Sequence, residues 1–125
     1  MNITLEQVRE SAKKIVEANP DLIYTQTEEF KNYGTCKYER FGEPSCLVGQ
    51  VLARLGVPVE VLAELDEQSD GSINGEDVPT VLFNAGFEVS NDAYRYMAEA
   101  QAVQDRTSRP NTWGEALARA EGRVS

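Results

Sequence analysis

The sequence predicts a mainly α-helical fold, a compact bundle of about six short helices that forms a single domain over residues 1–125. Three observations predict it. Apolar residues recur at helical spacing in several stretches, capping residues precede these stretches, and glycine or proline follows them. The length of 125 residues, with 41% apolar and 26% charged residues, also suits one soluble domain around one core.

The first helix is predicted to begin after Thr4. Thr4 and Gln7 have the spacing of a capping box, in which each side chain accepts a hydrogen bond from the other residue's backbone N–H. Ile3 and Val8 are placed for the hydrophobic staple that often accompanies such a box. The helix should end before Pro20, because proline disfavours a helical conformation in the residue before it.

Residues 21–43 lack helical periodicity. Aromatic residues are scattered among polar ones in this region, and residues 35–41 alternate with a period of two. The aromatic residues are Tyr24, Phe30, Tyr33, Tyr38 and Phe41. This pattern predicts either a small β-hairpin or an ordered loop in residues 21–43.

The clearest helix signature lies over residues 45–56. Ser45 is a candidate N-cap, Gly56 a candidate residue just past the C-terminus, and Pro58 prevents continuation. Small side chains lie in a row along one face of this helix: Cys46, Gly49 and Ala53. The row would let another helix approach closely, which offers a reason for Gly49 where glycine costs about 1 kcal/mol relative to alanine.

Two short helices are predicted on either side of residues 66–77. Apolar residues from Val59 to Leu65 indicate a third helix that runs into this stretch. A fourth helix begins after Asp77, which would cap it, and stops at Gly86.

Two more helices complete the bundle. The fifth begins near Ser90 or Asn91. The last begins at a second capping box, formed by Thr112 and Glu115. Its Trp113, the only tryptophan in the chain, is predicted to anchor this helix on the core.

The negative charge is concentrated in one segment. Residues 55–94 contain no lysine or arginine, whereas 12 bases and 12 acids occur in the rest of the chain, and the net charge is −9. The acids of this base-free segment are Glu60, Glu64, Asp66, Glu67, Asp70, Glu76, Asp77, Glu88 and Asp92. Such a surface repels phosphate backbones, so we expect no direct nucleic-acid binding, and it attracts a cation or a basic partner. A solvated acidic face that aids solubility is the alternative.

No segment marks the chain for a membrane or for export. No apolar run approaches the roughly 20 residues that a membrane span requires. The first residues also lack the basic and apolar regions of a secretory signal. We therefore expect a cytoplasmic protein that makes no membrane contact.

Cys36 and Cys46 are the only cysteines, and the chain has no histidine. This leaves too few soft ligands for a structural zinc site. In a reducing cytoplasm both should be thiols, one of them in the core, although a disulfide between them is sterically conceivable. Cys46 at a helix N-terminus is also open to interpretation as a nucleophile, but the chain offers no histidine as its base.

Residues 66–77 resemble an EF-hand calcium-binding loop. Such a loop takes oxygen ligands from its first, third, fifth, seventh, ninth and twelfth positions, with glycine at the sixth. The ligand positions here hold Asp66, Gln68, Asp70, Ser72, Asn74 and Asp77, with Gly71 at the glycine position. Gln68 and the short Asp77 depart from the pattern and should lower affinity. Without an ion, the same stretch would make two turns and a helix cap.

Two sequence blocks resemble a known group of proteins. The first is Pro44-Ser45-Cys46-Leu47-Val48-Gly49 with Val51-Leu52 and Leu55-Gly56-Val57-Pro58, and the second is Ala100-Gln101 and Gln104-Asp105 followed by Thr112-Trp113-Gly114-Glu115-Ala116-Leu117. Together they resemble short uncharacterised proteins of actinobacteria and their phages. The resemblance implies a source and a fold type and supplies no catalytic residues.

The sequence contains no recognisable catalytic motif: no glycine-rich phosphate loop, no Ser-His-Asp set and no zinc-binding HExxH. We therefore expect a non-catalytic protein-binding or regulatory protein without a cofactor, with calcium binding through residues 66–77 as the alternative. A phage origin would make the partner a host protein and the compartment the host cytoplasm. The residues expected to contact a partner, chosen from the aromatic region and the acidic segment, are Tyr33, Tyr38, Phe41, Glu60, Glu64 and Glu67.

Overall fold

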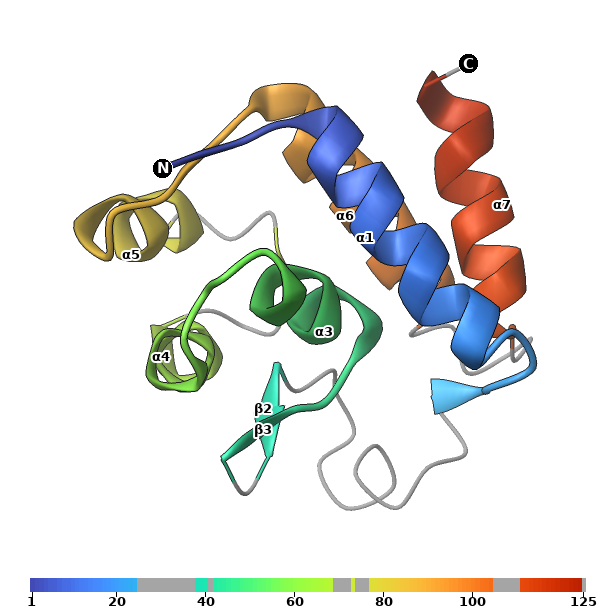
Figure 1. The fold of residues 1–125 in the computed structure, drawn as a ribbon, viewed down its shortest axis with the longest axis horizontal. Coiled ribbons are helices and arrows are strands. Elements are labelled where there is room, and N and C mark those ends of the chain that lie inside the picture. Colours follow the sequence, from blue (N-terminus) through green and yellow to red (C-terminus); the bar gives the residue numbers. More distant parts are fainter. Residues whose placement is uncertain (25–37, 41, 69–72, 74–76, 105–110, 125) are drawn as a thin grey trace.

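The computed structural model describes residues 1–24, 38–40, 42–68, 73, 77–104 and 111–124. Six α-helices lie within these residues, which confirms the predicted fold class (Figure 1). The helices are α1 (Leu5–Ala18), α3 (Leu47–Arg54), α4 (Val59–Gln68), α5 (Val78–Asn84), α6 (Asn91–Gln104) and α7 (Trp113–Val124). None of these helices is both long and apolar enough to cross a membrane.

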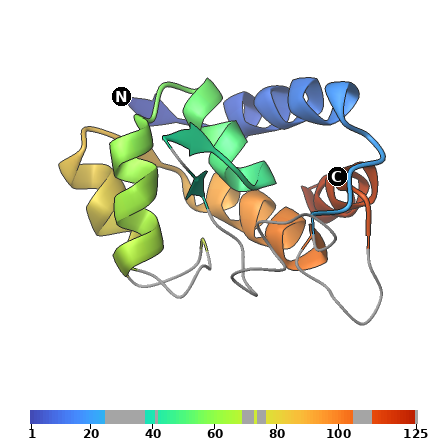
Figure 2. The same ribbon diagram turned by 90° about the horizontal axis from the view of Figure 1, so that it is seen from below.

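The two ends of the chain meet in one group of helices. α6 packs along α7, and α1 packs against both of them. α3 contacts α1 and α6, and α4 and α5 contact each other at the end of the molecule that lies away from α7 (Figures 1 and 2). The largest fully buried side chain belongs to Trp113, which confirms that the tryptophan anchors α7 on the core.

The predicted capping boxes start α1 and α7. The backbone N–H of Thr4 donates to Oε1 of Gln7 at 2.9 Å, and the N–H of Gln7 donates to Oγ1 of Thr4 at 3.3 Å. Thr112 and Glu115 exchange the same two bonds at 2.8 and 3.1 Å. Each pair satisfies two N–H groups that have no partner inside the helix, and both predicted helix starts are confirmed.

The N-cap of α3 is Cys46, and the prediction of Ser45 was wrong. Sγ of Cys46 accepts a hydrogen bond from the N–H of Gly49 at 3.5 Å. Ser45 is held outside the helix because its own N–H donates to the carbonyl oxygen of Tyr38 at 3.0 Å. Cys46 is a free, fully buried thiol, as expected for one of the two cysteines, while Cys36 lies outside the described residues.

Gly49 has a close neighbour, as predicted, but the neighbour is not a helix. A Cβ placed on Gly49 would lie 2.4 Å from the carbonyl oxygen of Tyr38 and 2.9 Å from its Cα. Only glycine permits this approach of two backbones. The contact joins the central helix α3 to the residue that precedes strand β2.

A short hairpin stands at the C-terminal end of the region 21–43. β2 (Glu39–Arg40) pairs antiparallel with β3 (Glu43–Pro44) in the register Glu39↔Pro44 and Arg40↔Glu43. Gly42 makes the turn with a φ of 80°, and its N–H donates to the Glu39 carboxylate at 2.7 Å. Of the two structures predicted for this region, the hairpin is therefore the one found in the described part.

A second pair of strands was not predicted. β1 (Asn2–Ile3) pairs in parallel with β4 (Glu88–Val89), in the register Asn2↔Glu88 and Ile3↔Val89. Strands of two residues are too short to produce the alternation by which a strand is recognised in a sequence. The pairing fixes the segment between α5 and α6 to the start of the chain.

Gln104 connects three helices inside the core. Its side chain is fully buried, and its Oε1 accepts hydrogen bonds from the N–H of Leu47 at 2.9 Å and the indole N–H of Trp113 at 3.1 Å. The first bond satisfies an N–H at the start of α3, and the second satisfies the only polar group of the tryptophan. Residues from both blocks of the resemblance therefore meet at one buried oxygen atom.

Candidate functional site

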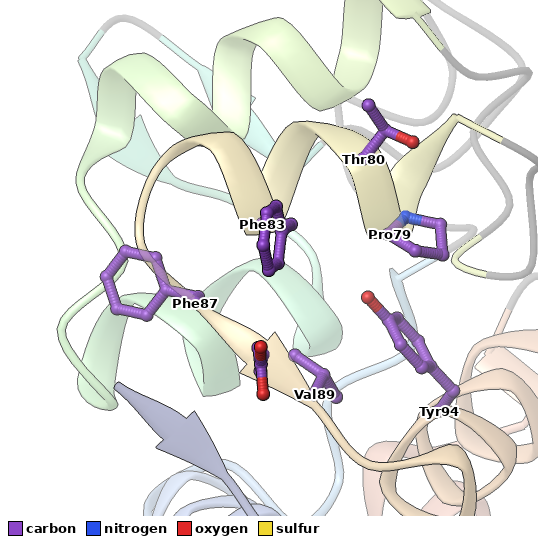
Figure 3. A pocket seen from close by; sticks show the side chains of 7 residues that line it. Pro79, Thr80, Phe83, Phe87, Val89 and Tyr94 are labelled. Carbon is purple, nitrogen blue, oxygen red and sulfur yellow. The ribbon is translucent and has the colours of Figure 1, made fainter.

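A groove opens between α5 and β4, with the start of α6 at one end (Figure 3). Its volume is about 420 Å³. The residues that line it are Pro79, Thr80, Phe83, Phe87, Glu88, Val89 and Tyr94. Three of these residues are aromatic and one is charged, which is the composition of a surface that binds an apolar group within an acidic setting.

Phe83 is the exposed aromatic residue of this groove. The buried face of α5 consists of Val78, Val81 and Leu82. Phe83 lies off that face, is 61% exposed, and extends from α5 toward β4 (Figure 3). A single exposed apolar residue is common in proteins, but Phe83 shares its groove with the half-buried rings of Phe87 and Tyr94.

A helix-ending motif places β4 beside α5. Gly86 has a φ of 95°, its N–H donates to the carbonyl oxygen of Phe83 at 2.9 Å, and the N–H of Phe87 donates to that of Leu82 at 2.8 Å. This is a Schellman motif, and its left-handed position favours glycine because a Cβ would be strained there. The chain turns back after Gly86, so that β4 forms the second wall of the groove (Figure 3).

The charge around the groove is acidic. Glu88 lines it and is exposed, and it belongs to the segment 55–94 that contains no base. Asp92, another acid of this segment, lies in the first turn of α6, and a hydrogen bond from the Ser90 hydroxyl lowers its pKa. Burial raises the pKa of Tyr94 to about 12, so its ring enters the groove as a neutral phenol.

The predicted interaction residues of the acidic segment lie on one face of α4. Glu60, Glu64 and Glu67 are all exposed, at positions three and four residues apart. α4 contacts α5, so this acidic face and the groove belong to the same end of the molecule (Figure 1).

Tyr38 is a core residue, which corrects its prediction as part of an interaction surface. Its side chain is 0% exposed, and its hydroxyl accepts a hydrogen bond from Nε2 of the buried Gln101 at 3.0 Å. The ring is covered because the hairpin packs against α3 and α4. The other two aromatic residues of that prediction, Tyr33 and Phe41, lie outside the described residues.

Asp66, the first of the predicted calcium ligands, has a structural partner. Its Oδ1 accepts a hydrogen bond from the N–H of Tyr38 at 3.0 Å, and its Oδ2 accepts one from the N–H of Glu39 at 3.1 Å. The carboxylate thereby fixes the start of the hairpin to the last turn of α4. This role needs no ion and was not foreseen from the sequence.

The other predicted ligands are described only in part. Gln68 is the last residue of α4, and Asp77 is at the N-cap position of α5 but makes no capping hydrogen bond through its side chain. Asp70, Ser72 and Asn74 lie outside the described residues. Within the described part of the chain, no three acidic, cysteine or histidine side chains are placed to hold a metal ion together.

The sequence did not single out the residues of the groove. A signal was present at Phe83, because the residues that form the buried stripe of α5 leave this large apolar side chain on the outside. The opposite wall had no such signal, since β4 is placed by pairing with β1, which lies 86 positions earlier in the chain.

The groove and the acidic segment are thus the features of the described chain that point to a ligand. The aromatic residues come from α5, the residue before β4 and α6, and the charge comes from the segment that contains all of them. The chain matches no protein-family model, no curated protein and no solved structure.

Proposed function

We propose that this protein is a non-catalytic binding protein that holds a basic segment of a protein partner in the groove between α5 and β4. The observation that carries the proposal is Phe83, a phenylalanine that is 61% exposed in a groove where the one charged lining residue within the described chain is the acid Glu88. Protein interfaces bury aromatic residues at their centres, while charges around the rim select the sign of the partner.

The charge argues for a basic partner. The segment 55–94 carries nine acids and no base, so it attracts lysine and arginine side chains and repels phosphate backbones. A second copy of this chain would bring two acidic segments together, which like-charge repulsion opposes. A different protein with a basic segment is therefore the occupant that the charge favours.

The groove also favours an apolar side chain in the partner's basic segment. Phe83, Phe87 and Tyr94 line the same hollow, and Tyr94 is uncharged at neutral pH. Covering one exposed aromatic side chain contributes about 1.5–3 kcal/mol. A volume of about 420 Å³ lies within the usual range for sites that take a few side chains or a small ligand.

A peptide array tests this proposal before the partner is known. The array contains capped peptides with equal numbers of lysine and leucine in every order, and a second array carries glutamate in place of lysine. We expect lysine-containing peptides to bind and to bind more weakly as salt is added, because salt screens exposed charges. Stronger binding of the glutamate peptides would contradict the proposal.

Two variants assign the binding to the groove. Phe83→Ser should weaken binding by at least about tenfold, and it should not disturb the fold because the ring is mostly exposed. Glu88→Lys should also weaken it, whereas Glu17→Lys, an exposed acid of α1 outside the acidic segment, should have much less effect. Binding that survives both groove variants would place the peptide elsewhere.

Phe83→Ser is also the control in a search for the partner in cells. The sequence resemblance makes an actinobacterial host the first place to search for the partner. A tagged wild-type chain should retrieve a protein that the Phe83→Ser chain does not retrieve, and that protein should contain a basic segment with apolar residues. A partner retrieved equally by both chains would not be held by this groove.

A further inference from the structure

We infer that the partner segment binds in an extended conformation and adds as a strand to the open edge of β4. The inference rests on the proposed function, since it concerns the same groove. Among the described residues β4 is paired along one edge only: the N–H of Glu88 donates to the carbonyl oxygen of Met1 at 2.9 Å, and the N–H of Ser90 donates to that of Ile3 at 3.1 Å.

Val89 lies between Glu88 and Ser90, and its N–H and carbonyl oxygen point away from β1. In a parallel pair, alternate residues of a strand bond to the neighbouring strand, and here these residues are Glu88 and Ser90. Neither the N–H nor the carbonyl oxygen of Val89 has a hydrogen-bond partner in the described part of the chain. Val89 therefore presents one donor and one acceptor at a free strand edge, which is what an added strand requires.

The groove runs along this free edge. Glu88 and Val89 both line it, although successive side chains of a strand point to opposite faces. We therefore place the hollow along an edge of the strand, and not over one of its faces. β1 occupies the other edge and lies on the side of β4 away from α5, so the free edge faces α5 and Phe83 (Figure 3).

The two faces of β4 specify the pattern of the added strand. Successive side chains of a strand point to opposite faces, so Glu88 favours a basic side chain opposite it on one face, and Val89, which lies beside Tyr94 (Figure 3), favours an apolar one on the other. A segment in which basic and apolar residues alternate satisfies both faces at once. Glu88 also disfavours pairing of this free edge with the same edge of another copy, since two acids would then meet.

The order of residues in the peptide provides the first test. The probe is a capped peptide in which lysine and leucine alternate, and the control has the same composition with its leucines at helical spacing. We expect the alternating peptide to bind at least about tenfold more tightly, because an extended segment can pair with both the N–H and the carbonyl oxygen of Val89 and a helix cannot. Equal or tighter binding of the helical peptide, abolished by Phe83→Ser, would overturn strand addition and leave the proposed function intact. Binding of neither peptide would overturn both.

Hydrogen exchange at β4 provides the second test. The alternating peptide should slow exchange of the Val89 amide by at least about tenfold, because it gains an acceptor. The amides of Glu88 and Ser90, which already bond to the carbonyl oxygens of Met1 and Ile3, are internal controls and should change less. Methylation of single peptide nitrogens should weaken binding most at one position, the nitrogen that donates to the carbonyl oxygen of Val89. An unchanged Val89 amide in the presence of bound peptide would overturn the inference.

Discussion

A Cβ atom at position 49 would lie only 2.4 Å from the carbonyl oxygen of Tyr38, which is too close for two such atoms. Gly49 is in the first turn of α3, and Tyr38 immediately precedes strand β2. The same carbonyl oxygen accepts a hydrogen bond from the N–H of Ser45. The central helix and the hairpin are therefore joined through backbone atoms, and the side chain at position 49 decides whether they can meet.

Gly49→Ala should lower the free energy of unfolding by about 2 kcal/mol. Alanine would gain up to about 1 kcal/mol in an unobstructed helix, but the clash with a backbone atom requires α3 or the hairpin to shift, and overpacking costs about 1–3 kcal/mol. Chemical denaturation measures the difference. The matched control is Gly122→Ala in α7, where a Cβ meets no heavy atom within 4 Å and stability should stay equal or rise. An equal response of the two variants would contradict the contact at Tyr38.

The helix ends could be predicted because the interactions that form them are local. Thr4 and Gln7 are three residues apart, and Gly86 closes α5 through bonds to residues within the preceding turn. Capping residues and glycine act over such distances whatever the rest of the chain does. The starts of α1 and α7 and the ends of α3 and α5 followed from these signals.

The walls of the groove and the hairpin contact could not be predicted because they depend on residues far apart. Ile3 pairs with Val89, and the Asp66 carboxylate binds amides that lie 27 and 28 residues earlier. The N-cap of α3 also depends on another part of the chain. The N–H of Ser45 donates to the carbonyl oxygen of Tyr38, just before the hairpin, and this bond holds Ser45 outside the helix. The sequence pattern of one element does not show which contacts a distant element will make with it.

Gln104→Met should lower the free energy of unfolding by about 2–4 kcal/mol. The change keeps the volume similar but removes the one oxygen that accepts from the N–H of Leu47 and the indole of Trp113, and each buried donor left without a partner costs about 1–3 kcal/mol. In a Trp113→Phe background, one of these two donors, the indole N–H, is already absent. The loss caused by Gln104→Met should therefore be smaller in the Trp113→Phe background, and strictly additive effects would contradict the shared oxygen.

Stability should fall in acid partly through one ion pair. Arg9 on α1 donates two hydrogen bonds to Glu121 on α7, both at 2.8 Å, and these lower the pKa of Glu121 from its ordinary value of 4.5 to about 2. Because the folded pKa is the lower one, the stabilisation is complete above about pH 5 and is lost as the pH falls toward about 2. Glu121→Gln should flatten the pH dependence of unfolding in this window. Arg9→Gln should flatten it similarly, and an unchanged acid limb would contradict the pairing.

Tyr96→Phe should leave the free energy of unfolding unchanged or raise it by up to about 1 kcal/mol. The Tyr96 hydroxyl is buried and has no hydrogen-bond partner among the described residues, and burial, followed by the nearby Glu121 carboxylate, raises its pKa. The matched control is Tyr38→Phe, which removes a hydroxyl that accepts from Gln101 and should destabilise by about 1–2 kcal/mol. A clear loss of stability in Tyr96→Phe would instead show that its hydroxyl bonds to Glu121.

Asp66→Ala should destabilise the protein in the absence of calcium. The variant loses the acceptor of two backbone N–H groups at Tyr38 and Glu39, at a cost of about 1–3 kcal/mol, and Asp66→Asn should lose less because one oxygen remains. Thermal unfolding in EDTA measures both losses.

Calcium should add no stabilisation that magnesium does not, because Asp66 already directs both oxygens at the hairpin. A calcium site with a dissociation constant of about 10 μM would instead stabilise the wild type by about 2.7 kcal/mol in about 1 mM calcium. Such a rise, absent from Asp66→Ala, would make Asp66 a calcium ligand as well as the support of the hairpin.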